Sequence, residues 1–339
     1  MSNVIARVTG RLGHLTLDRP EALNALDTAM VRALDAALAA WADDDRVAAV
    51  LIEGAGGRGL CAGGDVRALH RQARAGGAGA HDFWAAEYRL NARIAAYPKP
   101  YVAFMDGLVM GGGVGVSAHG SVRVVTERTQ LAMPEVRIGF VPDVGASHLL
   151  ARAPGRLGLH LALTGVTVSG ADAVLLGLAD HYVPAGRLPR LRAALAGGDP
   201  AAAVAEVAAP LPAPPLAADA DWIAACYAAG SVAAAVQRLR AWGGAAAAAA
   251  ALISTRSPTA LCLTWELLRL GAEGGVVEAL DREWAVATAL LHSHDFAEGV
   301  RAQLIDKDRR PRWSPAALAE VDQAAVAAAL AGAAGPRPR

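Results

Sequence analysis

The sequence predicts an α/β protein in which strands and helices alternate over the first half and a helical region follows. Short apolar runs of strand length recur in the first half, at 4–9, 47–52 and 101–105. Segments with helical spacing of apolar residues lie between them, and beyond about residue 220 the helical spacing continues. Of the 339 residues 54% are hydrophobic, which is ample material for a core.

The first elements are predicted to be a hairpin and a helix. Residues 4–9 and 14–17 alternate in polarity on either side of the turn between Gly10 and Gly13. Asp27 is a favourable N-cap for a helix with an apolar stripe of Met30, Leu34, Leu38 and Trp41. The next predicted elements are a strand at 47–52, a helix at 82–96, strands at 101–105, 122–126 and 130–132, and a Pro-containing loop at 133–144.

The composition of the second half predicts a division into three parts. We expect a core over 1–195, a linker rich in Pro and Ala over 196–220, and a helical region over 221–339. Ser257 and Pro258 begin one helix of that region, and others are predicted at 276–291 and near Asp295.

Charge, cysteine content and hydropathy argue against several classes of protein. The 32 basic and 32 acidic residues balance, so a general affinity for nucleic acid is not expected, although a local patch for a phosphorylated ligand is. Three cysteines without a CxxC pair argue against a disulfide framework or zinc site. No signal peptide is recognisable, and the alanine tract at 243–253 is too short for a membrane span, so we expect a cytoplasmic protein.

Two glycine-rich segments follow predicted strands, one ending at Gly63-Gly64 and one spanning 111–115. Glycine lets a backbone approach a ligand and expose its N–H groups, and two such groups on one oxygen would form an oxyanion hole. The alternative is that both segments are tight strand-to-helix turns that bind no ligand, which would have the same glycine-rich composition. Neither segment has the G-x-G-x-x-G spacing of a dinucleotide site or the Lys of a P-loop.

The loop at 133–145 places two acids, Glu135 and Asp143, among apolar residues. Burial raises the pKa of a carboxyl group, which allows the group to act in acid–base catalysis near neutral pH. The alternative is a surface ion pair with Arg137 or Arg152. 

Other candidate groups are weaker. Ser117 and Ser147 lack the G-x-S-x-G context of a nucleophile, and Cys61 lacks a histidine partner, which favours a packed residue. For the segment 292–295, capping by Asp295 is favoured over metal binding. Trp265 and Trp284 lie on apolar helical stripes and are expected in the core.

Four stretches of the chain share the pattern of one known superfamily: 17–26 (LDRPEALNAL), 60–67 (LCAGGDVR), 107–145, and Ser257-Pro258-Thr259 together with 294–302 (HDFAEGVRA) and 305–308. Through them the chain resembles the crotonase (enoyl-CoA hydratase/isomerase) superfamily, and within it the branch of 3-hydroxyisobutyryl-CoA hydrolases. The resemblance covers nearly the whole chain except roughly 195–250 and the tail after about 330. 

The resemblance implies a spiral of ββα units, commonly assembled as a homotrimer or hexamer, that binds an acyl-CoA and needs no metal or separate cofactor. It implies that Gly64 and Gly112 supply the two amides of an oxyanion hole. It also implies that Glu135 is the main catalytic carboxylate, Asp143 its partner, and Glu87 a further substrate contact. Arg19, Arg58 and Arg67 are near enough in sequence to these loops to meet the CoA phosphates.

One departure from the hydratases bears on the reaction. Hydratases use two glutamates, and the position that matches the first is Gly115 here. We therefore expect hydrolysis of 3-hydroxyisobutyryl-CoA, as in valine catabolism, with 3-hydroxypropionyl-CoA as a second substrate. The alternatives are an enoyl-CoA hydratase, a Δ3–Δ2 enoyl-CoA isomerase, which manages with one carboxylate, and a non-catalytic acyl-CoA-binding protein. Whether Glu135 is a nucleophile or a general base stays open.

Overall fold

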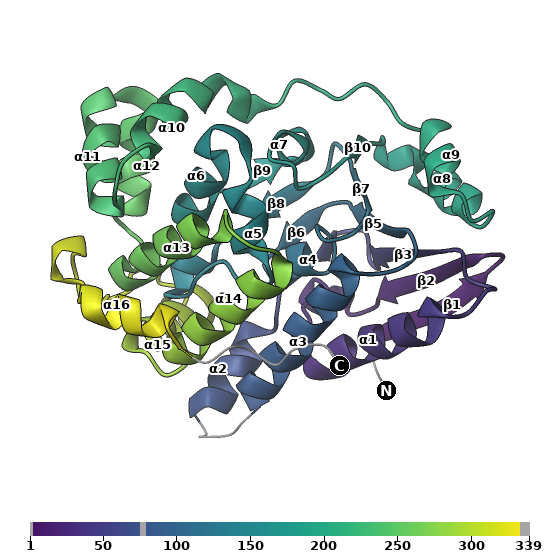
Figure 1. Cartoon of the computed structure of the whole chain (residues 1–339), viewed down its shortest axis with the longest axis horizontal. Coiled ribbons are helices and arrows are strands. Elements are labelled where there is room, and N and C mark those ends of the chain that lie inside the picture. Colours follow the sequence, from purple (N-terminus) through teal and green to yellow (C-terminus); the bar gives the residue numbers. More distant parts are fainter. Residues whose placement is uncertain (1–2, 75–78, 333–339) are drawn as a thin grey trace.

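The computed structural model describes residues 3–74 and 79–332 and confirms the α/β class, with two sheets enclosed by helices (Figure 1). The larger sheet has the order β1-β2-β3-β5-β7-β10, in which only β1 and β2 are antiparallel. Its strands are β1 (Val4–Thr9), β2 (Leu12–Leu17), β3 (Ala49–Gly54), β5 (Tyr101–Met105), β7 (Val122–Val125) and β10 (His181–Tyr182). The predicted hairpin is therefore present.

The smaller sheet has the order β4-β6-β8-β9, and its first three strands are parallel. Its strands are β4 (Gly59–Cys61), β6 (Leu108–Met110), β8 (Gln130–Ala132) and β9 (Val168–Ser169). Successive strands alternate between the sheets: β3, β5 and β7 join the larger one, and β4, β6 and β8 the smaller one. The chain thus winds as a spiral that adds one strand to each sheet per turn, as the resemblance implies.

The helices of the first two thirds surround this spiral. The predicted cap of α1 is confirmed, because the Asp27 side chain accepts a hydrogen bond from the Met30 amide at 2.8 Å. These helices are α1 (Thr28–Ala42), α2 (Val66–Arg74), α3 (Gly79–Ala95), α4 (Gly112–Gly115), α5 (Ala146–Ala151), α6 (Leu157–Thr164), α7 (Gly170–Leu175), α8 (Leu188–Leu195) and α9 (Pro200–Ala205). Single 3-10 turns occur at Pro20–Ala22, Glu135–Ile138, Pro154–Arg156, Ala185–Arg187 and Pro215–Asp219.

Apolar side chains of the larger sheet point alternately to its two faces, and both faces are therefore covered. In β3, Val50 and Ile52 enter the main core, whereas Leu51 faces a second cluster beneath α8 and α9. Beyond α9 the chain runs extended across the top of the molecule to α10 (Figure 1). The domain boundaries at 195 and 220 stay a prediction.

The C-terminal helices pack against the spiral. They are α10 (Ala220–Tyr227), α11 (Val232–Trp242), α12 (Gly244–Ile253), α13 (Pro258–Gly271), α14 (Val276–Leu290), α15 (His294–Val300) and α16 (Gln323–Leu330), with a π-helical turn at Arg301–Ile305 and a 3-10 turn at Leu318–Glu320. Helix α14 lies against α3 and α5 (Figure 1). Among the described residues no single helix is long and apolar enough to cross a membrane, and α12 and α13 meet that test only jointly, across a bend of 114°.

One expectation for this region is wrong. Asp295 does not cap α15, because the Ser293 side chain does so by accepting from the Phe296 amide. Asp295 is buried instead, where it accepts from the Ser257 hydroxyl at 2.5 Å and the Ser314 amide at 2.8 Å. It therefore joins the start of α13 to the start of α15.

Candidate active site

Three of the predicted site residues follow the parallel strands of the smaller sheet. Gly64 comes shortly after β4, Gly112 two residues after β6, and Glu135 shortly after β8. Because the carboxyl ends of parallel strands meet at one edge of a sheet, the topology brings the three residues together. Asp143 follows on the same loop as Glu135, and Glu87 reaches the site from α3.

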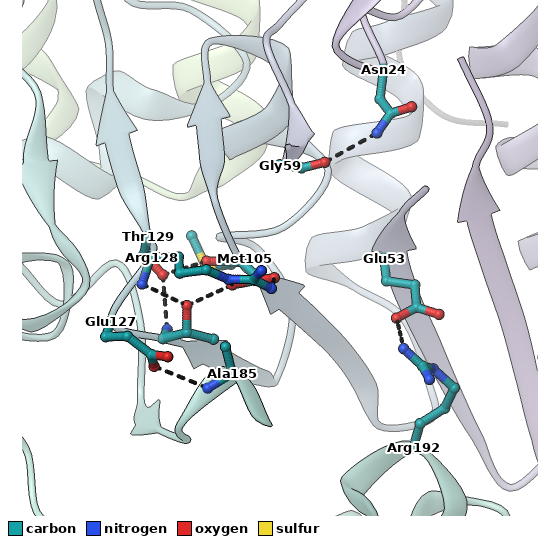
Figure 2. Close-up of polar contacts among 11 residues, drawn as sticks. Asn24, Glu53, Gly59, Met105, Glu127, Arg128, Thr129, Ala185 and Arg192 are labelled. Atoms are coloured by element: carbon teal, nitrogen blue, oxygen red, sulfur yellow. Dashed lines mark hydrogen bonds and ion pairs between the residues drawn. The ribbon is translucent and has the colours of Figure 1, made fainter. Parts of the chain in front are cut away.

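The opening motif at 17–26 supports the first of these loops. Asn24 donates its side-chain amide to the carbonyl of Gly59, at the start of β4, at 3.1 Å (Figure 2). The Leu26 amide donates to Gly63 at 2.8 Å, and the Asp65 amide donates to Leu26 at 2.8 Å. These bonds hold the turn on both sides of Gly64 and leave its own amide out of the pairing.

The two glycine turns lie against each other. A Cβ atom built on Gly112 would be 3.3 Å from the amide nitrogen of Gly64, and one built on Gly63 would be 3.5 Å from that of Gly112. Within residues 3–74 and 79–332, neither the Gly64 nor the Gly112 amide has a protein acceptor. Two unpaired donors thus stand side by side at the sheet edge.

Glycine is required here because the acids approach the backbone closely. A Cβ on Gly111, whose φ is +50°, would be 2.9 Å from Glu135 Oε1. A Cβ on Gly112 would be 2.4 Å from Glu87 Oε1. Any larger residue at either position would displace a carboxylate.

The three predicted acids are buried and incompletely paired. Glu87, Glu135 and Asp143 are 2%, 8% and 6% exposed. Asp143 accepts a hydrogen bond from the Tyr88 hydroxyl at 2.7 Å. In the part of the chain that the structure describes, Glu87 Oε1 and Glu135 Oε2 have no partner. A buried polar atom without a partner is costly, so these two oxygens mark a site for a ligand or a reacting group.

Burial raises the pKa of all three carboxyl groups. The pKa of Asp143 rises to about 6, chiefly because burial disfavours its charge, although the Tyr88 hydroxyl bond opposes the rise. Burial, followed by the charge of Asp143, raises the pKa of both Glu87 and Glu135 well above the ordinary value. The cluster can therefore hold both protonated and ionised acids near neutral pH.

These groups line a cavity of 780 Å³ that, among the described residues, also carries six arginines. The arginines are Arg19, Arg58, Arg67, Arg71, Arg137 and Arg309, which include the three predicted from the sequence. Arg19 pairs with Asp65 at 3.0 Å, and Arg67 donates to the carbonyl of Leu304 at 2.6 Å. Cationic side chains with an apolar floor suit a ligand that has an anionic end and a small acyl end.

The apolar part of the cavity wall includes a cluster of aromatic rings. The rings of Trp84 and Phe140 stack with centroids 5.1 Å apart, and Phe296 packs on Phe140 at 5.4 Å. Phe140 comes from the acidic loop and Phe296 from α15. The C-terminal region thus contributes to the cavity directly.

The alternative readings of the sequence fail for several groups. Arg152 does not pair with Asp143, because it donates to the carbonyls of Gly271 and Gly274. The Ser117 hydroxyl donates to the Gly113 carbonyl within the core. Cys61 is buried as predicted, and burial raises the pKa of its thiol to about 12. Among the described residues no cluster of His, Cys, Asp or Glu could hold a metal ion.

Sequence reasoning missed three buried polar groups behind the acids. Tyr88 bonds to Asp143, and Glu283 from α14 accepts from the backbone beyond Asp143. Neither amide atom of Asn91, one helical turn after Glu87, has a partner among the described residues. The spacing of Glu87, Tyr88 and Asn91 on one helix was the available signal, whereas nothing local points to Glu283.

Fold and site together define an enzyme built on a spiral α/β core, with buried acids beside paired glycine turns. The family model for enoyl-CoA hydratase/isomerase matches residues 12–330, so the chain belongs to the crotonase family, whose members act on acyl-CoA substrates.

The similar proteins carry different names, which include 3-hydroxyisobutyryl-CoA hydrolase, carnitinyl-CoA dehydratase and enoyl-CoA hydratase. The chain is 42% identical to a mitochondrial 3-hydroxyisobutyryl-CoA hydrolase of Xenopus tropicalis, over 92% of this chain and 84% of the relative. It is 38% identical to the human protein of that name, over 94% and 86%. A carnitinyl-CoA dehydratase structure from Mycobacterium thermoresistibile is 53% identical over 97% and 96%, with a TM-score of 0.94.

Proposed function

We propose that this enzyme hydrolyses the thioester of 3-hydroxyisobutyryl-CoA, with 3-hydroxypropionyl-CoA as a second substrate, and releases the hydroxy acid and free CoA. The observation that carries the proposal is the set of three buried acids around Gly64 and Gly112, two of which present an oxygen without a partner in the described part of the chain. The curated hydrolases at about 40% identity support it.

In the proposed reaction the thioester oxygen lies between the amides of Gly64 and Gly112. Negative charge grows on this oxygen as the carbonyl carbon is attacked, and fixed N–H dipoles stabilise that charge. Because neither amide has an acceptor among the described residues, neither must break a bond to serve this role.

Glu135 acts on the carbonyl carbon in one of two ways. As a base it takes a proton from water, whose oxygen bonds to the acyl carbon while the C–S bond breaks and the proton passes to sulfur. As a nucleophile it expels the thiolate to form an anhydride, which water then hydrolyses. Both routes require the ionised carboxylate.

Asp143 and Glu87 are proposed to hold the 3-hydroxyl group of the acyl chain. Their raised pKa values let one accept a hydrogen bond while the other stays protonated. A plain acyl chain would leave these buried groups unpaired, which penalises the wrong substrate.

The dehydratase name of the 53% identical structure makes addition or removal of water the second candidate. A matching pair of glutamates would need one at position 115. A Cβ built on Gly115 would be 2.7 Å from Val144 Cβ and 2.8 Å from Asn91 Nδ2, so a glutamate side chain has no room there. Glu87, which reaches the cavity from α3, would have to serve instead, and hydrolysis therefore remains our proposal.

The test measures thiol release from 3-hydroxyisobutyryl-CoA, 3-hydroxypropionyl-CoA and isobutyryl-CoA beside hydration of crotonyl-CoA and isomerisation of a 3-enoyl-CoA. We expect thiol release to dominate and to be fastest with the hydroxylated substrates. Rapid crotonyl-CoA hydration without thiol release would reject hydrolysis in favour of the second candidate. Binding of all the thioesters without any turnover would favour an acyl-CoA-binding protein.

A further inference from the structure

The loop that carries Asp143 has a strained backbone. Val144 adopts a φ of +57°, in the left-handed region that β-branched residues almost never enter. Such a conformation is unfavourable and persists only where the surroundings impose it. The neighbours of Val144 must therefore hold the loop in place.

Two side chains hold this loop from different directions. The carboxylate of Glu283 accepts from the Gly145 amide at 2.6 Å, the Ser147 amide at 2.9 Å and the Ser147 hydroxyl at 2.5 Å. The His119 ring donates from Nε2 to the Val144 carbonyl at 2.7 Å, and burial lowers its pKa to about 4, so the ring is neutral. 

Burying the carboxyl group of Glu283 to hold this loop costs free energy. Its side chain is completely buried, and burial, with a contribution from Asp143, raises its pKa to about 8 against the effect of its own hydrogen bonds. A buried ionisable group often adds little net stability compared with apolar packing, so stability alone does not explain a glutamate at this position. The loop that Glu283 holds determines the position of the Asp143 carboxyl group.

The same helix also supports the partner of Asp143. Trp284, next in sequence to Glu283, packs edge-on against the Tyr88 ring with centroids 6.2 Å apart. Helix α14 therefore contacts both ends of the hydrogen bond between Tyr88 and Asp143: the ring directly, and the carboxylate through Gly145 and Ser147.

We infer that Glu283 is a positioning residue, which holds the strained loop so that the Asp143 carboxylate faces Tyr88 and the cavity. Glu283 lines no part of the cavity itself, so it acts through Asp143. The consequence for substrate choice rests on the proposed function, whereas the placement of Asp143 does not.

The first test is a crystal structure of Glu283→Gln. A glutamine has one acceptor oxygen and turns an NH₂ toward a backbone donor, so the loop loses part of its support. We expect Asp143 to leave hydrogen-bonding distance of Tyr88. Glu278→Gln is the matched control on the same helix, because Glu278 is exposed and accepts from the Gly275 amide at its own helix start. Asp143 unmoved in Glu283→Gln would overturn the inference.

The second test compares kcat/KM for 3-hydroxyisobutyryl-CoA with kcat/KM for isobutyryl-CoA. In Glu283→Gln the ratio should fall at least about tenfold, since small misplacements of site groups cost up to about a hundredfold, and in Glu278→Gln it should not change. Equal losses on both substrates would indicate a merely structural role and overturn the inference. 

Two safeguards keep the experiments decisive. If Glu283→Gln does not fold, Ser147→Ala removes one of the three contacts and should shift the ratio in the same direction by a smaller factor; an unchanged ratio there would count against the inference. If the wild-type enzyme releases no thiol, the proposed function fails, and the crystal structure alone then decides whether Glu283 positions Asp143.

Discussion

Replacing Asp143 with asparagine should stabilise the folded protein while it impairs the proposed reaction. The pKa of this carboxyl group rises from 3.8 to about 6 on folding. Each tenfold change in proton affinity is worth about 1.4 kcal/mol, so ionised Asp143 lowers the free energy of unfolding by about 3 kcal/mol at pH 8. Asparagine carries no such charge and still offers Tyr88 an acceptor oxygen.

The sign of the pH dependence follows from the raised pKa. Below pH 3.8 the group is protonated in both states, and above about 6 it is ionised in both, so wild-type stability is lost as the pH rises between these values. The advantage of Asp143→Asn should therefore grow from about 1 kcal/mol at pH 4.5 to about 3 kcal/mol at pH 8.

Urea unfolding at both pH values measures this difference directly. Asp221→Asn, at an exposed position of α10, is the control for the same chemical change at the surface. Its stability relative to wild type should not depend on pH in this way. A gap between wild type and Asp143→Asn that stays constant from pH 4.5 to pH 8 would refute the assignment of a buried, destabilising charge.

Further predictions concern the reaction. Glu135→Gln should abolish thiol release but leave binding of an acyl-CoA intact by calorimetry; residual turnover near the wild-type rate would remove Glu135 from the mechanism. Gly112→Ala should lower kcat/KM by about 10²–10³ because its Cβ would press on Glu87 and crowd the Gly64 amide. Gly186→Ala, where a Cβ meets nothing within 4 Å, should have no effect. The rate should fall with decreasing pH about a midpoint above 4.5, because the ionised form of Glu135 is needed and its pKa is raised. Asp143→Asn should move that midpoint to lower pH, and an unmoved midpoint would argue against charge coupling between the two acids.

The elements that sequence reasoning predicted well are those whose signals are local. The alternation in the first hairpin, the Asp27 cap and the stripe of α1 each depend on neighbours within a few residues. Glu135 and Asp143 could be identified as candidates because they lie in an apolar loop. Burying an acid costs free energy, so a buried acid in such a loop indicates a functional role. Gly64 and Gly112 could be predicted as turns, and their mutual contact follows only from the parallel order of β4 and β6.

The features that escaped prediction depend on contacts between distant segments. Glu283 reaches the loop at Gly145 across 138 positions of the chain, and no spacing rule connects them. Asp295 looked like a helix cap because the residue type fits, but Ser293 is better placed, and the buried bond to Ser257 takes Asp295 elsewhere. The same limit applies to Tyr88, whose partner Asp143 is 55 positions away.

The backbone of Val144 connects the choice of reaction to the choice of substrate. In its left-handed conformation its side chain lies over Gly115, which the resemblance matches to the first glutamate of the hydratases. Its neighbour Asp143 is at the same time turned into the cavity beside Glu135. One strained residue thus removes space for the second hydratase acid and supplies a different acid instead. Both effects come from a single backbone conformation. A change of Val144 to a negative φ would therefore open the space over Gly115 and move Asp143 out of the cavity at the same time.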